Sequence, residues 1–141
     1  LNKKDWLKAE QEARQAVEAE PGLATGYNNL GVALAQQNKL EEARMALDRA
    51  LKIDPRDREV LINLAMIELS LQNEGRALQL FLRALAIDPE NSQNGLIYNN
   101  LAVIYFHLEK YELSWEFVQK ALQTGFKVDE NLINDLIKKL K

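Results

Sequence analysis

This sequence has few residues that could catalyse a reaction or bind a metal. His107 is the one histidine and cysteine is absent, so these residue types cannot supply a thiol nucleophile or several convergent metal ligands. The glycines are scattered and form no phosphate-binding loop. Acidic pairs such as Glu41-Glu42 and Asp129-Glu130 lie where helices should begin, and the helix dipole accounts for them. We therefore expect no enzyme activity, no metal site and no cofactor.

A set of regularly spaced asparagines offers a different chemistry, that of binding. Asn29, Asn63 and Asn100 are separated by 34 and 37 residues, and each follows a large apolar or aromatic residue by two positions. Because an amide side chain offers both a donor and an acceptor, three in line could pair with the main chain of an extended ligand. Alternatively, each amide bonds within its own structural unit or to the next unit. The sequence leaves both interpretations open.

Further residues accompany these asparagines at helical spacing. They are Val32, Gln36, Met66, Leu69, Val103, Phe106 and His107. The apolar members could select apolar side chains of a ligand, and no lysine or arginine falls on this stripe. His107 could favour an acidic ligand group when protonated, but the preferred interpretation is a partly exposed groove residue with no proton-transfer role.

The elements that must position these residues recur with a period of 34. The equivalent pairs are Leu30 and Leu64, Gly31 and Ala65, Ala43 and Ala77, Leu47 and Phe81, Ala50 and Ala84, and Pro55 and Pro89. A third copy follows after 37 residues, with an insertion near Ser92-Gln93-Asn94. A fixed period of this size indicates stacked repeats, in which one helix pair cannot bury its apolar face alone.

On these residues the chain resembles the tetratricopeptide repeat family. The first copy carries the family pattern at Tyr27, Leu30, Gly31, Leu34, Ala43, Leu47, Ala50 and Pro55. The second copy departs from it at Leu61, which replaces an aromatic residue, and at Glu68, which replaces a large apolar one. The third copy has Ser114 at a small-residue position and Phe126 in place of the closing proline. The resemblance implies a right-handed, all-α solenoid whose leading helices line a concave groove for partner peptides or helices.

The repeat pattern divides the chain into one domain of five segments. Residues 1–23 form the second half of a repeat, 24–57, 58–91 and 92–128 form full repeats, and 129–141 form a capping helix. The helices we expect are Trp6–Ala19, Ala24–Gln36, Leu40–Ile53, Arg58–Leu71, Glu74–Ile87, Gly95–His107, Tyr111–Gln123 and one after Asp129. Because the sequence opens within a repeat, we interpret it as part of a longer polypeptide.

Composition narrows the class of partner. The net charge of −3 and the pI near 5.3 argue against general nucleic-acid binding. No stretch approaches the roughly 18 apolar residues that cross a bilayer. The absence of cysteine fits the cytoplasm and, if an upstream signal has been removed, the periplasm, so the compartment stays unknown.

These observations favour a non-catalytic adaptor or scaffold that binds a peptide or helix of a partner protein in its concave groove. The absence of basic residues from the stripe argues against a groove that clamps a ligand carboxylate. The alternative function is self-association, in which the repeat end near Trp6, Leu7 and Val17 packs on a second copy.

Overall fold

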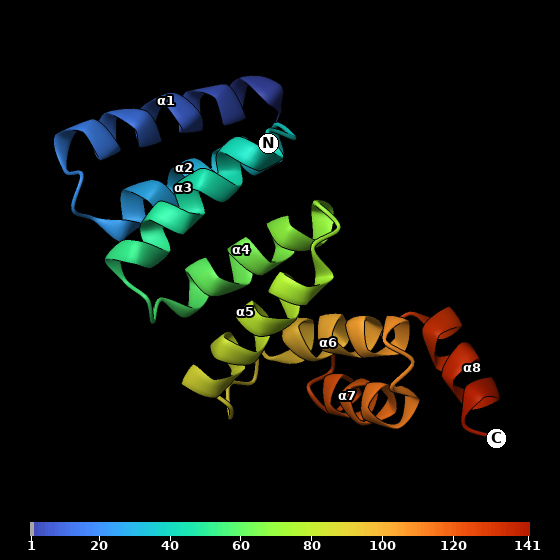
Figure 1. Ribbon diagram of the computed structural model, residues 1–141. Helices are drawn as coiled ribbons and strands as arrows, with labels where there is room; N and C mark the ends of the chain where they lie inside the picture. The colour runs from blue at the N-terminus through green and yellow to red at the C-terminus, as the bar shows by residue number, and fades with distance from the viewer. Residues whose placement is uncertain (1) are drawn as a thin grey trace. The chain divides into compact units, whose positions relative to one another are not determined.

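The computed structural model describes residues 2–141, and this part of the chain is all-α, with no strand (Figure 1). The helices are α1 (Lys3–Ala19), α2 (Ala24–Gln36), α3 (Leu40–Ile53), α4 (Arg58–Ser70), α5 (Glu74–Ile87), α6 (Gly95–His107), α7 (Tyr111–Gln123) and α8 (Glu130–Lys139). The helical-repeat fold expected from the sequence is confirmed, and the helix bounds agree to within three residues.

The largest difference in bounds is the start of α1, which begins at Lys3 rather than at Trp6. Asn2 caps this helix, because its side chain accepts the backbone N–H groups of Lys4 at 2.9 Å and Asp5 at 3.2 Å. Asp5 in turn accepts the backbone N–H of Asn2 at 2.9 Å. This reciprocal capping box satisfies donors that a helix start otherwise leaves without partners.

The chain forms two compact units that divide after Ala84, within α5. The first unit contains α1 to α4 and most of α5, and the second contains the end of α5 together with α6, α7 and α8. We describe each unit by itself.

The same tight turn joins the two helices of every complete hairpin. One residue of each turn lies in the left-handed region, at φ values of 60°, 63° and 58° for Asn38, Gln72 and Glu109. The next residue donates its N–H to a carbonyl five positions earlier: Lys39 to Leu34 at 3.0 Å, Asn73 to Glu68 at 2.7 Å, and Lys110 to Tyr105 at 2.9 Å. These bonds satisfy carbonyls at the end of the leading helix.

Within the first unit, α2 and α3 approach most closely at Gly31. A Cβ atom at this position would lie 2.6 Å from Cγ of Leu47 and 3.3 Å from the carbonyl oxygen of Ala43. Leu47 and Ala43 are themselves fully buried. Glycine is therefore required by the contact between the two helices, since any larger residue would overpack it.

Glu68 of α4 is fully buried in the first unit, although the family pattern has a large apolar residue at its position. The side chain of Asn73 donates to its carboxylate at 2.8 Å, and Arg76 of α5 forms an ion pair with it. Arg76 also pairs with Asp48 of α3, and this hydrogen bond is the main reason that the pKa of Arg76 is raised. The buried carboxylate is thus compensated and links three helices.

In the second unit, α6 and α7 form the hairpin. Ser114 of α7 replaces the small alanine of the other repeats, and its hydroxyl donates to the carbonyl of Ala102 at 2.6 Å. The rings of Tyr105 and Phe117 stack with centroids 5.5 Å apart. Leu136 of α8 is fully buried as that helix packs against α7. The expected C-terminal helix therefore packs on this hairpin and covers part of its apolar surface.

Candidate functional site

A hollow of about 150 Å³ lies between α2 and α4 in the first unit. Four of the predicted binding residues line it: Val32 and Gln36 from α2, and Asn63 and Met66 from α4. Met66 is 38% exposed, which leaves an adaptable thioether at the rim. The structure therefore brings these four residues together, although only Val32 and Met66 occupy equivalent positions of the repeat.

Asn63, which lines this hollow, also belongs to a chain of hydrogen bonds between the repeats. Asn63 donates its side-chain N–H to the side-chain oxygen of Asn28 at 3.0 Å, and Asn28 donates to the carboxylate of Glu59 at 3.1 Å. Asn28 is buried, so these bonds hold its amide in one orientation. At least one amide hydrogen of Asn63 therefore stabilises the contact between α2 and α4.

Asn29 and Leu69, the other predicted binding residues of the first unit, do not line the α2–α4 hollow. Asn29 is exposed and lines a second hollow, between α1 and α2, together with Val32. Leu69 is half-buried on α4.

The predicted binding residues of the second unit all lie on α6. The side chain of Asn100 donates to the carbonyl of Leu96 at 2.8 Å, one turn earlier in the same helix. Val103 is half-buried and His107 is exposed. Phe106 is half-buried, with its ring edge-on to Tyr111 at 5.5 Å between centroids.

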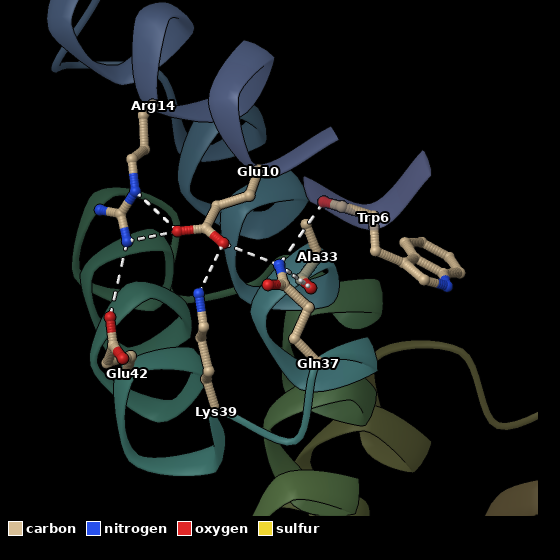
Figure 2. A network of polar contacts seen from close by, with 7 residues as sticks. All are labelled: Trp6, Glu10, Arg14, Ala33, Gln37, Lys39 and Glu42. Carbon is tan, nitrogen blue, oxygen red and sulfur yellow. Dashed lines mark hydrogen bonds and ion pairs between the residues drawn. The ribbon is translucent and has the colours of Figure 1, made fainter. Parts of the chain in front are cut away.

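A polar network that the sequence analysis did not identify fixes α1 against the α2–α3 hairpin, and Figure 2 shows it. The carboxylate of Glu10 accepts from Lys39 at 2.9 Å, Gln37 at 2.7 Å and Arg14 at 2.9 Å. Arg14 also lies 3.5 Å from the carboxylate of Glu42 on α3. The hydrogen bond from Lys39, followed by those from Gln37 and Arg14, outweighs the effect of burial and lowers the pKa of Glu10 to about 2.

The same position carries an ion pair at both junctions of the first unit, with the charges exchanged. Arg14 and Glu42 join α1 to α3, and 34 residues later Asp48 and Arg76 join α3 to α5. A plain comparison of residue types along the repeat hides this equivalence, because each acid in one pair aligns with a base in the other.

Residues 2–141 contain no group of three or more metal-ligating side chains, and no helix among them is both long and apolar enough to cross a bilayer.

Tetratricopeptide repeat models match residues 24–57, 43–92 and 96–124 of the chain. Among curated proteins, the Hsp70-Hsp90 organising protein of Plasmodium falciparum (isolate 3D7) is 30% identical over 91 residues, which is 62% of this chain and 16% of that protein. The BBSome complex member BBS4 of Xenopus tropicalis is 30% identical over 108 residues, 77% of this chain and 20% of that protein. The chain thus spans a fifth or less of the length of these relatives.

Two solved structures share the fold. The crystal structure of MamA has a TM-score of 0.74 at 18% identity, with 82% of this chain and 66% of that chain covered. YrrB, described as a TPR protein with an unusual peptide-binding site, has a TM-score of 0.74 at 24% identity, with coverage of 82% and 58%. The repeated turns and the close contact at Gly31 agree with the three family-model matches. Those family-model matches show that the chain belongs to the tetratricopeptide repeat family.

Proposed function

We propose that this protein is a non-catalytic adaptor that binds a segment of a partner protein in the α2–α4 hollow. Protein–protein interaction is the role generally associated with the family, and the finer assignment to this hollow is ours. The observation that carries it is the meeting of Val32, Gln36, Asn63 and Met66 at one open site.

The size of the hollow indicates what kind of ligand group it takes. At about 150 Å³ it is smaller than the roughly 300–1,000 Å³ of sites that enclose a drug-sized molecule. It suits one apolar side chain that projects from a peptide and contacts Val32 and Met66. The exposed amide of Gln36 offers a donor and an acceptor to the main chain beside that anchor.

The α6 residues extend the proposal to the second unit. There, Asn100, Val103, Phe106 and His107 present the same mixture of amide and apolar groups on a leading helix. We propose that they contact a further part of the same partner. This contribution is testable separately, by substituting Val103 and Phe106 together while the first unit is left unchanged.

The test is selection of peptides from a displayed random library against the immobilised protein, followed by measurement of their Kd by fluorescence anisotropy. Met66→Ala should weaken the selected peptides by roughly tenfold or more, since it removes a contact at the rim of the site. Met45→Ala is the matched control, because Met45 is 70% exposed on α3 and lies outside the hollow. Equal losses for the two variants, or none, would place the binding site elsewhere.

Self-association through the end of the repeat stack is the competing function. Leu7 is 47% exposed on α1, which leaves an apolar residue on that surface. Light scattering across a concentration series tests this alternative, because self-association predicts a mass above that of the monomer, and a monomer at every concentration would contradict it.

A further inference from the structure

A third hollow of the first unit, of about 270 Å³, is formed by residues of α1, α2 and α3, and we call it the α1–α3 hollow. Its floor is apolar, because Leu30 and Leu34 of α2 and Ala46 of α3 line it and all three are buried. Tyr27 and Met45 form its sides, and Met45 is 70% exposed. None of these residues lines the α2–α4 hollow, so the two sites are separate.

The α1–α3 hollow is open because α3 carries a small residue at one position. The positions equivalent to Ala46 hold Leu80 in α5 and Phe117 in α7, and both of these larger side chains are buried. The second and third repeats therefore fill this place with a side chain of their own, whereas the side chain of Ala46 ends at Cβ. The opening thus follows from Ala46 and not from the half repeat at the start of the sequence.

A cation at the rim of the α1–α3 hollow has no acidic partner. Arg49 is exposed, its guanidinium lies 5.9 Å from the centroid of the Tyr27 ring, and it forms no ion pair within residues 2–141. The equivalent cation of the third repeat, Lys120, pairs at 3.3 Å with Glu116, one helical turn earlier. Met45 occupies the position of Glu116 in the first repeat, so Arg49 lacks the carboxylate that the third repeat supplies.

The remaining charges that line the hollow compensate each other. Arg14 of α1 lies 3.5 Å from the carboxylate of Glu42 on α3 and 2.8 Å from that of Glu10 (Figure 2). The hollow therefore keeps one uncompensated positive charge, at Arg49, although the chain as a whole has a net charge of −3. A positive rim beside an apolar floor is complementary to a ligand that is both acidic and apolar.

From these observations we infer that the α1–α3 hollow binds an acidic segment of a partner protein, in which a large apolar residue lies close to an aspartate or glutamate. The apolar side chain takes the place that Leu80 and Phe117 fill in their own repeats. The carboxylate pairs with Arg49 as Glu116 pairs with Lys120. The partner thus supplies the two groups that the first repeat lacks, at a site separate from the α2–α4 hollow.

The size of the hollow agrees with this occupant. At about 270 Å³ it is smaller than the roughly 300–1,000 Å³ of sites that enclose a drug-sized molecule, and it suits one large side chain that projects from a peptide. Met45 is unbranched and flexible, so its thioether can adapt to leucine, methionine or phenylalanine at that place.

The test is a selection of peptides from a displayed random library on the native protein, after depletion on the Ala46→Leu protein. Only peptides that need the open hollow remain, and we expect them to carry aspartate or glutamate within about two residues of leucine, methionine or phenylalanine. The urea midpoint of Ala46→Leu should stay at or above that of the native protein, because the second repeat accommodates Leu80 at the same position. Ala86→Leu is the matched control, since Ala86 is exposed on α5, and it should leave binding unchanged.

An exchange of charges tests Arg49 independently, with the Kd of a retained peptide measured by fluorescence anisotropy. Arg49→Gln should raise the Kd by about 3–10-fold, and Arg49→Glu should raise it further. Replacing the acidic residue of the peptide by lysine should restore binding to Arg49→Glu. Arg56→Gln removes an exposed arginine outside the hollow and should leave the Kd unchanged. If Ala46→Leu does not fold, Arg49→Glu takes its place in the depletion step.

Several results would overturn the inference. They are the retention of no peptide, retained peptides without the acidic and apolar pair, and a charge exchange that restores no affinity. A dimer that Ala46→Leu dissociates would show that a second copy of this chain occupies the hollow, and not a partner protein. Met66→Ala should leave the retained peptides unaffected, whereas it weakens ligands of the α2–α4 hollow, so failure of one site is distinguishable from failure of the other.

Discussion

Glu10 provides the sharpest test of how α1 is held on the repeat stack. The substitution Glu10→Gln keeps the shape of the side chain but removes its negative charge, which Lys39, Gln37 and Arg14 surround. We expect α1 to detach from the α2–α3 hairpin more easily, because the network joins the two (Figure 2).

The magnitude follows from the pKa of Glu10 and from the exposure of its partners. Lowering that pKa from 4.5 to about 2 corresponds to about 3 kcal/mol of stabilisation if the whole effect is realised. The side chains of Lys39 and Arg14 are 38% and 48% exposed, so solvent screens part of the attraction. A loss of about 1–2 kcal/mol at pH 7 is therefore expected.

The pH dependence has a defined sign. A carboxyl group whose pKa is lowered by folding stabilises the protein above its unfolded pKa of 4.5, and this contribution disappears as the pH falls toward about 2. The difference in unfolding free energy between the native protein and Glu10→Gln should therefore be full at pH 6 and shrink between pH 4.5 and 2.

The assay is urea unfolding followed by Trp6 fluorescence. It uses a Trp115→Phe background, so that all tryptophan fluorescence comes from α1. Glu12→Gln is the matched control, because its exposed carboxylate has only a 3.8 Å pair with Lys8. It should change the free energy by no more than about 0.5 kcal/mol. The reasoning is refuted if the two variants behave alike at pH 7, or if the effect of Glu10→Gln does not change with pH.

Three further substitutions test the packing of the first unit by urea unfolding. Gly31→Ala should destabilise by about 1–3 kcal/mol through its clash with Leu47, and in a Leu47→Ala background it should be neutral or stabilising. Gln72→Gly should stabilise by about 0.5–1 kcal/mol, because its φ of 63° is left-handed, and a loss of stability would contradict this. Arg76→Met should cost about 3 kcal/mol by leaving the Glu68 carboxylate buried without its cation, and a neutral result would show that Asn73 suffices.

The fold was predictable because its signals are local. Apolar periodicity, the closing prolines Pro55 and Pro89 and the small residue at Gly31 each act within one hairpin, and the 34-residue period repeats them. Even the early start of α1 has a local signal in the sequence, because Asn2 and Asp5 form the capping box.

The polar contacts were harder to predict, because they join residues far apart in the sequence. Asn63 bonds to Asn28 across 35 residues, and Glu10 meets Lys39 across 29. Asn63 and Asn100 occupy equivalent positions, yet one donates between repeats and the other to its own helix. The three asparagines occupy equivalent positions of α2, α4 and α6, but the partner of each depends on neighbours that differ from repeat to repeat.

The methionines allow the adaptor site to be tested most directly, because the sequence has only two, Met66 in the α2–α4 hollow and Met45 on α3 outside it. The measurement is a methyl NMR spectrum of methionine-labelled protein, recorded while a library-selected peptide is added to saturation. We predict that the Met66 methyl signal shifts and the Met45 signal stays in place. A saturating peptide that leaves the Met66 signal unmoved would contradict the assignment of this hollow as the binding site.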